Sequence, residues 1–239
     1  MKNVTVTFLL ILFICMKLML MPAYSDPLNI QWGKPKRISN ENNQLLRSDL
    51  SIISDKDRMA VVWIQGKVGD SSIFIYRKDN ANSYTLQITA GHEDRDPRIF
   101  KFKNQYYILF SRKIMEKKDD EKIYITPYVL MIMKSPDLKL WSEPEIIRIN
   151  QKNTDNIEPF PMVVENNLII FWIAGNQNFK LWSSKTEDLA NFSKPEALWN
   201  KQGMLHYPFI VQTGEESYCL LYTSPSPRDR TRYRMPSSA

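Results

Sequence analysis

Cysteine, histidine and glycine are scarce in this 239-residue sequence, and each shortage excludes a class of protein. The two cysteines, Cys15 and Cys219, lie near the ends of the chain, so the segment between them is not a disulfide-built module. Seven glycines supply no phosphate-binding loop or dinucleotide motif, and no nucleophile elbow or Cys/His dyad is present. We therefore expect no cofactor and no metal, since the one alternative cation site lacks a specific ligand spacing: His92, Glu93, Asp94 and Asp96.

A strong net charge is also missing from the central part of the chain. The formal net charge is +6, but Lys2 and Lys17 account for two charges and residues 219–239 account for three more. Residues 26–218 therefore carry a net charge of only +1. The basic isoelectric point of about 9.1 gives no reason to expect a nucleic-acid partner.

The N-terminal segment has the features of a secretory signal peptide. Lys2 is followed by an apolar run over residues 8–16, and Ala23-Tyr24-Ser25 is a small-x-small cleavage signal. The alternative is a membrane anchor, but Lys17 ends the run before it is long enough to span a bilayer. We expect residues 1–25 to be removed. The mature protein would then be secreted, periplasmic or part of the cell envelope, with no membrane span.

The C-terminal segment, residues 219–239, is rich in serine, proline and arginine and has no hydrophobic period. A disordered basic tail is one interpretation. The string CLLYTSPSPRD also resembles a translated sequencing adaptor, which implies a non-native segment. We therefore expect the native folded segment to be residues 26–218.

Short apolar segments separated by polar turns repeat along residues 26–218, and helical periodicity is absent. The segments that begin each repeat start at residues 49, 96, 158 and 207, which are 47 to 49 residues apart except for one interval. That interval is lengthened by the charged insertion 113–122, expected to be a solvated hairpin loop. The predicted strands are 49–54, 59–65, 71–78 and 84–89; 96–101, 105–111, 124–135 and 145–149; 158–164, 168–173, 178–184 and 196–199; and 207–212.

Four strands per repeat of this length are typical of a β-propeller blade. We predict an all-β protein with four-stranded antiparallel blades, of which about three and a half are present; a sandwich with long hairpins is the alternative. The motif Trp32-Gly33-Lys34-Pro35 matches the segment before the last strand of a repeat, which predicts that the N-terminus closes the ring. An incomplete ring has open edges, so we expect these residues alone to aggregate.

Two turns carry a common motif. Asp137 stands four residues before Trp141, and Asp188 stands four residues before Phe192. Each aromatic residue is followed by Ser-x-Pro and a short strand. The motif resembles the Asp-box repeats of sialidases and other BNR-repeat propellers, and the resemblance implies that these aspartates stabilise turns rather than act in catalysis.

The beginnings of the first strands converge on one mouth of the channel in a propeller, so the chemistry of the protein is expected there. We predict catalytic roles for Asp49, Asp96, Glu158 and Tyr207. We predict substrate-binding roles for Arg47, Arg95, Arg98 and His206. Each has a plain alternative, since surface arginines are common and Asp-Pro or Glu-Pro also begins strands.

The resemblance also carries a function. Arg47 resembles the first arginine of the sialidase carboxylate-binding triad, which implies hydrolysis of a terminal, anionic sugar such as sialic acid and a carbohydrate partner. The Asp96-Pro97 opening also resembles the five-bladed propellers of arabinanase- and fructosidase-type glycosidases. A non-catalytic BNR-type propeller that binds glycan or protein at the cell surface is a third hypothesis, because fold alone does not fix activity.

Overall fold

The computed structural model describes residues 46–67, 69–79, 82–118, 121–176, 178–199, 206–212 and 218–223. All of them belong to one compact unit, Ile38–Ala239. The predicted signal peptide, the predicted closing strand after Pro35 and the end of the C-terminal segment lie outside the described residues. Within the described ranges, no helix is long and apolar enough to cross a membrane.

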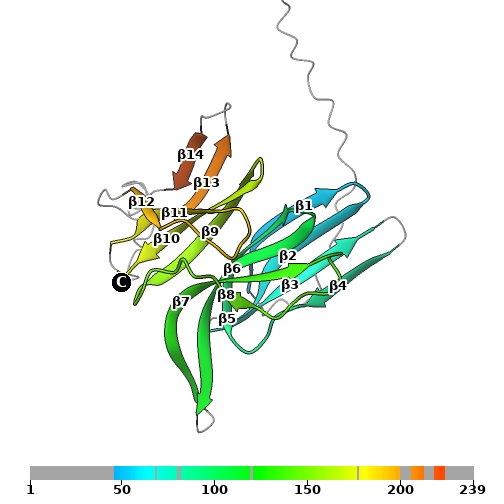
Figure 1. The fold of residues 1–239 in the computed structure, drawn as a ribbon. Coiled ribbons are helices and arrows are strands. Elements are labelled where there is room, and N and C mark those ends of the chain that lie inside the picture. The colour runs from blue at the N-terminus through cyan, green and yellow to red at the C-terminus, as the bar shows by residue number, and fades with distance from the viewer. Residues whose placement is uncertain are drawn as a thin grey trace, which may run out of the picture. The chain divides into compact units, whose positions relative to one another are not determined.

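The described chain forms fourteen strands, which fall into three sets of four and one pair (Figure 1). The first set is β1 (Leu46–Asp55), β2 (Arg58–Lys67), β3 (Asp70–Lys78) and β4 (Ser83–Gln87). The second is β5 (Glu93–Phe102), β6 (Gln105–Lys118), β7 (Glu121–Ser135) and β8 (Glu145–Ile146). The third is β9 (Asp155–Val164), β10 (Asn167–Gly175), β11 (Lys180–Thr186) and β12 (Glu196–Trp199), and the pair is β13 (His206–Gln212) and β14 (Tyr218–Thr223).

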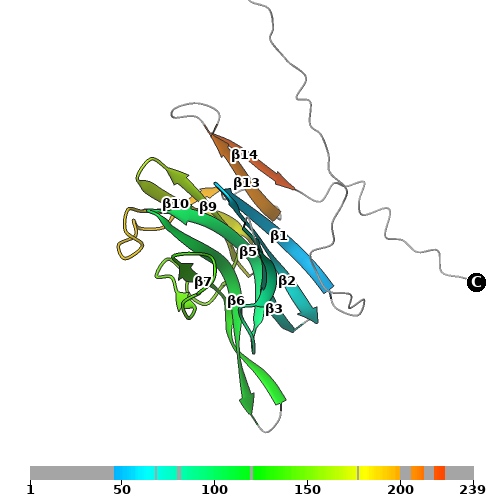
Figure 2. The ribbon, with the colours of Figure 1, turned by 90° about the vertical axis from the view of Figure 1, so that its right-hand side faces the viewer.

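Each set is an antiparallel blade in which neighbours in sequence are neighbours in the sheet. One parallel bridge, between Ser71 and Glu93, joins the first two blades into a single sheet. The first strand of each blade contacts the first strand of the next, so β5 lies between β1 and β9 (Figures 1 and 2). This arrangement is that of a β-propeller and confirms the predicted fold class; the ring is incomplete.

The hairpin turns follow from local sequence. At the turn between β5 and β6, Lys103 and Asn104 both have positive φ, 44° and 63°, inside the closing pair Phe102 and Gln105. Two central residues of this kind form the mirror-image turn whose twist matches that of antiparallel strands. Asn tolerates this conformation well, and Lys103 is the less favourable member.

The core lies between successive blades, because each sheet has two faces to bury. One apolar cluster joins the first and second blades through residues such as Val62, Ile75 and Phe110. A second joins the second and third blades through residues such as Leu130 and Trp172. The first strand β5 contributes Ile99 to the first cluster and Phe100 and Phe102 to the second, so packing fixes it on both faces.

The structure differs from the sequence-based prediction at three places. Residues 113–122 are not a solvated loop: β6 and β7 continue through them as a ribbon, with Lys118 paired to Glu121. The first strands begin three residues before Asp49, Asp96 and Glu158, so these residues lie within strands. β14 extends to Thr223, into the segment assigned to the tail, because its apolar residues pair with β13.

The two related turns have the same hydrogen bonds. The Asp137 carboxylate accepts the backbone N–H bonds of Lys139 and Leu140, at 2.8 and 3.1 Å. The Asp188 carboxylate accepts those of Ala190 and Asn191, at 2.9 and 2.8 Å. These bonds confirm the prediction that both aspartates stabilise turns. Trp141 and Phe192 pack against the clusters between the blades.

The Asp188 turn provides a stability prediction. Hydrogen bonds from Asn191 and Ala190 lower the pKa of Asp188 to about 2. Because this folded-state pKa lies below the usual 3.8, the stabilisation is complete above about pH 4 and is lost as the pH falls toward 2. Asp188→Ala should therefore lower the melting temperature at pH 7 by a few degrees, with a smaller difference from wild type at pH 2.5. Thermal unfolding followed by circular dichroism measures this.

The matched control is Glu187→Ala, which removes an exposed acid from the same turn. It should leave the melting temperature unchanged within a degree. An equal decrease in the two variants would contradict the assigned role of Asp188.

Candidate functional site

All four first strands contain a β-bulge at the same position. In each case two residues of the first strand lie opposite one residue of the second strand, as the registers on either side require. The bulged pairs are Asp49-Leu50, Asp96-Pro97, Glu158-Pro159 and Tyr207-Pro208. The residues opposite them are all aromatic: Trp63, Phe110, Trp172 and Tyr222. The four predicted catalytic residues therefore occupy equivalent positions.

The backbone at the three acidic bulges is in the left-handed region. The φ angles are 58° at Asp49, 53° at Asp96 and 52° at Glu158. Glycine is the usual residue at such a position, because a Cβ atom costs about 1 kcal/mol there. The three acidic residues therefore concentrate backbone strain at one end of the first strands. Such concentrated strain is typical of functional sites.

The bulges bring the carboxylates of neighbouring blades together. The backbone N–H of Glu158 donates to Asp96 Oδ2 at 3.1 Å, across 62 positions in the sequence. Asp96 and Glu158 are 7% and 6% exposed, whereas Asp49 is only partly buried. The charges of Asp49 and Glu158 both act on Asp96. Asp96 therefore lies between the other two carboxylates.

This environment strongly affects protonation. Burial raises the pKa of Asp96 to about 7, and repulsion from the Asp49 and Glu158 carboxylates adds to the effect. The hydrogen bond from Glu158 and the positive charge of Arg98 act in the opposite direction but are weaker. The cluster can therefore hold one proton up to about neutral pH, as acid–base chemistry requires.

Three of the aromatic residues opposite the bulges are buried. Phe110 and Trp172 are completely buried, and Trp63 is 5% exposed. Trp172 Nε1 donates to Asn156 Oδ1 at 3.2 Å, and buried Asn156 also accepts the Gln151 N–H, at 2.8 Å. These contacts fix the beginning of β9, two residues before Glu158.

Two of the predicted binding arginines lie near the carboxylates, in different roles. Arg98 is close enough to Asp96 to lower its pKa, and its buried Nε atom has no hydrogen-bond partner among the described residues. Arg95 bonds the Glu93 carboxylate through Nε and Nη2, at 3.2 and 2.8 Å. The guanidinium of Arg95 also lies 5.1 Å from the ring centre of Tyr128.

The segment before Asp96 does not form a cation site. Asp94 and Arg112 form a buried bidentate ion pair, with Nε–Oδ1 at 2.6 Å and Nη2–Oδ2 at 3.0 Å. Glu93 bonds Arg95, and His92 Nδ1 accepts the Met115 N–H at 3.3 Å. Among the described residues, no group of three potential ligands could hold a metal ion. The side chains of this segment are thus engaged with Arg112, Arg95 and the backbone of β6.

For the remaining predicted residues, Arg47, His206 and Tyr207, the structure describes the strand pairing only. Arg47 pairs with Gln65 in the β1–β2 ladder, and His206 pairs with Thr223 at the bulge that contains Tyr207. The side chains of Arg47, His206 and Tyr207 lie outside the described part of the structure. The assignment of these residues to the site stays a prediction.

Sequence reasoning missed the residues that support the site. Arg112 of β6 bonds Asp94, the Tyr128 ring of β7 lies against Arg95, and Lys113 of β6 lies against the same ring. One local signal existed, because proline follows Asp96, Glu158 and Tyr207 directly. Proline has no N–H to donate and is found in sheets mainly at edges and bulges, so these pairs marked the bulges.

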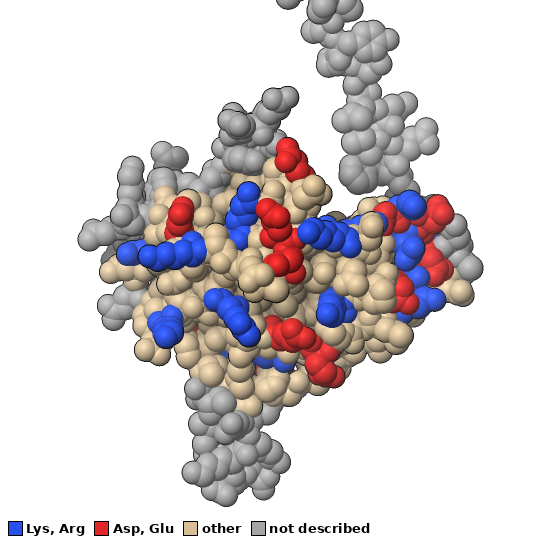
Figure 3. Space-filling view, viewed as in Figure 1, with Lys and Arg blue, Asp and Glu red and all other residues tan. Residues whose placement is uncertain are grey.

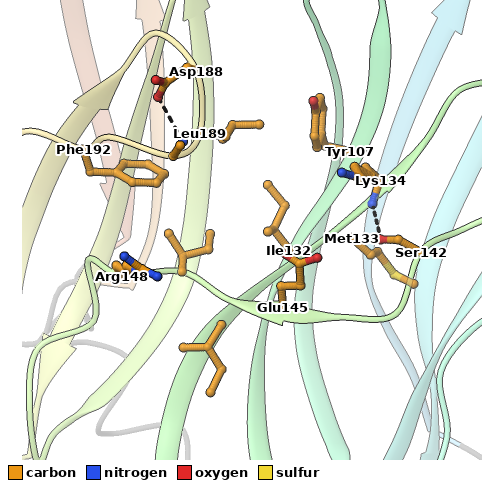
Figure 4. Close-up of a pocket in the computed structure, with 13 residues that line it drawn as sticks. Tyr107, Ile132, Met133, Lys134, Ser142, Glu145, Arg148, Asp188, Leu189 and Phe192 are labelled. Atoms are coloured by element: carbon orange, nitrogen blue, oxygen red, sulfur yellow. Dashed lines mark hydrogen bonds between the residues drawn. The ribbon is translucent and has the colours of Figure 1, made fainter.

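A cavity of about 390 Å³ lies elsewhere, between the second and third blades (Figure 4). Its walls include Tyr107, Arg148 and Phe192, and the turn that contains Asp188 closes one side (Figure 4). None of the three bulge carboxylates lines it. Charged residues of both signs are interspersed on the face shown in Figure 3, consistent with the small central net charge.

Comparisons with known proteins support the fold. No family model matches the sequence, and no curated protein matches it closely. The catalytic domain of a family 62 α-L-arabinofuranosidase from Coprinopsis cinerea superposes with a TM-score of 0.54 at 13% identity, over 77% of this chain and 61% of that one. An α-L-arabinanase from Penicillium chrysogenum gives 0.54 at 14% identity, over 76% and 58%.

A family 32 β-fructofuranosidase from Bombyx mori gives a TM-score of 0.55 at 12% identity, over 74% of this chain and 40% of that one. The structural neighbours are thus β-propeller glycoside hydrolases. The present chain spans less than two thirds of the length of each of these three. At this level of identity the likeness establishes the propeller fold.

Proposed function

We propose that the protein is a carbohydrate-active glycoside hydrolase whose catalytic groups are the three bulge carboxylates. The observation that carries this proposal is the meeting of Asp49, Asp96 and Glu158 at equivalent strained positions, with a pKa of about 7 for the buried central member. Glycoside hydrolysis requires one protonated carboxylic acid and one carboxylate on the two sides of the scissile bond. A cluster that keeps one proton near neutral pH meets this requirement.

The roles can be divided by side-chain length and exposure. Asp96 and Glu158 are about equally buried, and Asp96, which accepts the Glu158 N–H, keeps a proton in the cluster up to about pH 7. Glu158 has the longer side chain and delivers the proton of the cluster to the leaving oxygen. Asp49 is the most exposed of the three and acts as the base that activates water.

The proposed substrate is a carbohydrate of the arabinan or fructan type. The structures that this chain resembles include an arabinofuranosidase, an arabinanase and a fructofuranosidase. These relatives favour the arabinanase- and fructosidase-like hypothesis over hydrolysis of sialosides. With the predicted signal peptide, the enzyme would act on carbohydrate outside the cytoplasm.

A panel of aryl glycosides tests the proposal. We expect release of the aryl alcohol from an α-L-arabinofuranoside, or of glucose from sucrose, but not from an aryl sialoside. Glu158→Gln, which keeps the side-chain shape, serves as the blank and should show no turnover. If the folded wild-type protein turns over no member of the panel, the hypothesis of a non-catalytic binding module is favoured instead. Full activity of Glu158→Gln would contradict the role of Glu158 as the acid.

A further inference from the structure

Two cations share one aromatic ring beside the carboxylate cluster. The Arg95 guanidinium lies 5.1 Å from the ring centre of Tyr128, and the Lys113 ammonium lies 5.5 Å from it. Tyr128 itself is only 8% exposed. The ring therefore fixes two positive charges near each other, although like charges repel.

This pair of cations lies beside the carboxylate cluster. Arg95 directly precedes Asp96 in β5, and Glu93 pairs with Lys113 between β5 and β6. Lys113 lies on β6 opposite Tyr128 on β7, where the two strands begin to extend as a ribbon. The ribbon predicted as a solvated loop thus places a cation over the edge of the site.

Among the described residues, only part of the hydrogen-bonding capacity of Arg95 is used. Its side chain is 49% exposed, whereas that of Glu93 is 7% exposed. Both bonds to Glu93 end on the same oxygen, Oε1, and involve Nε and Nη2. A guanidinium carries five N–H donors, so the Nη1 side remains available to a ligand. Glu93 and Tyr128 therefore orient the group without saturating it.

We propose that Arg95 and Lys113, held on Tyr128, form a subsite for an anionic substituent of the substrate, a carboxylate or a sulfate ester. Binding of the anion does not require hydrolysis. The role of the subsite rests on the proposed function, because it would position the charged sugar next to the scissile bond. Arginine binds such oxyanions through paired N–H bonds, and lysine adds a point charge. The proposed substrate is thus an arabinan- or fructan-type carbohydrate that carries a carboxylate or sulfate substituent.

Matched pairs of carbohydrates test the subsite by affinity electrophoresis. The first pair is polygalacturonate and its methyl ester, the second is carboxymethylated and unmodified arabinan, and the third is carrageenan before and after desulfation. In a Glu158→Gln background, which prevents hydrolysis, we expect the charged member of at least one pair to bind roughly tenfold more tightly than the neutral member. The first two pairs report a carboxylate and the third reports a sulfate.

Arg95→Gln and Lys113→Gln should each remove most of this difference and leave binding of the neutral member unchanged. Lys103→Gln is the matched control: it removes a lysine that also lies over an aromatic ring, at 5.5 Å from the centre of Phe102, but at the opposite end of β5. It should keep the charge preference. Thermal unfolding confirms that each variant is folded.

No charge preference in any pair would overturn the subsite, as would equal losses for charged and neutral members. The two proposals fail separately. Hydrolysis of a neutral aryl glycoside without charge preference would leave the carboxylate site and remove the subsite. A charge preference that depends on Arg95, in a protein without turnover, would keep the subsite and remove the hydrolase.

Discussion

Asp96→Asn should lower kcat at least a hundredfold at pH 7 and at the same time make the folded protein more stable at pH 8. The change replaces one carboxylate oxygen by an amide nitrogen and keeps the shape of the side chain. Asn also tolerates a φ of 53°, and its oxygen can still accept the Glu158 N–H. The backbone at the bulge should therefore not change.

The loss of turnover follows from the proton balance of the cluster. Asp96 is the group that retains a proton up to about pH 7 in this cluster. Without it, Asp49 and Glu158 remain, and the cluster lacks the group that holds a proton up to about pH 7. Activity should then fall at a lower pH than in the wild type, and the loss at pH 7 should reach the range of general acid–base catalysis, roughly 10² to 10⁴.

The gain in stability has a definite sign. The folded-state pKa of Asp96, about 7, lies above the value of 3.8 expected when the chain is unfolded. A carboxyl group with a raised pKa favours folding below pH 4, and this contribution is lost as the pH rises from 4 to 7. The shift corresponds to about 4 kcal/mol, so the variant should gain this amount relative to wild type between pH 4 and pH 8.

Urea unfolding at pH 4, 6 and 8 measures the difference, and kcat on the preferred aryl glycoside measures the activity. Asp57→Asn is the control, because Asp57 is an exposed acid in the turn between β1 and β2. It should change neither quantity. A difference in stability that does not vary with pH would contradict the assigned state of Asp96.

The strands and turns of this fold could be predicted because their signals are local. Short continuous apolar runs define β2, β6 and β10, and polar pairs such as Lys103-Asn104 define the turns. The position of Asp96, Glu158 and Asp49 on one line of first strands followed from the repeat alone. The bulges did not, because an extra residue appears only when the register of two strands is known.

The partners of the site depend on contacts that are distant in sequence. Arg95 was predicted as a binding arginine, but its contact with Tyr128 depends on the pairing of β5, β6 and β7. Lys113 was assigned to a solvated loop because its neighbours are charged. The ribbon forms because its two strands still pair as far as Lys118 and Glu121, beyond the end of the blade.

Arg112→Gln should destabilise the protein by about 3–5 kcal/mol, which corresponds to a decrease in melting temperature of roughly 10 °C. Arg112 and Asp94 are 7% and 0% exposed, and their bidentate pair is the principal polar contact between β5 and β6 near the bulge. Glutamine cannot compensate the Asp94 charge, which would remain buried. Thermal and urea unfolding at pH 7 measure the loss.

The double variant Asp94→Leu, Arg112→Met separates the charge from the packing. Both side chains keep a similar volume, and replacement of a buried ion pair by apolar residues is often neutral, so most of the stability should return. A double variant as unstable as Arg112→Gln would show that shape rather than uncompensated charge is the cause. Ser71 Oγ donates to the Asp94 carbonyl oxygen at 2.7 Å, a contact that needs only the backbone of residue 94. The link between the first two blades should therefore persist in the double variant, and the Asp96 bulge should keep its position.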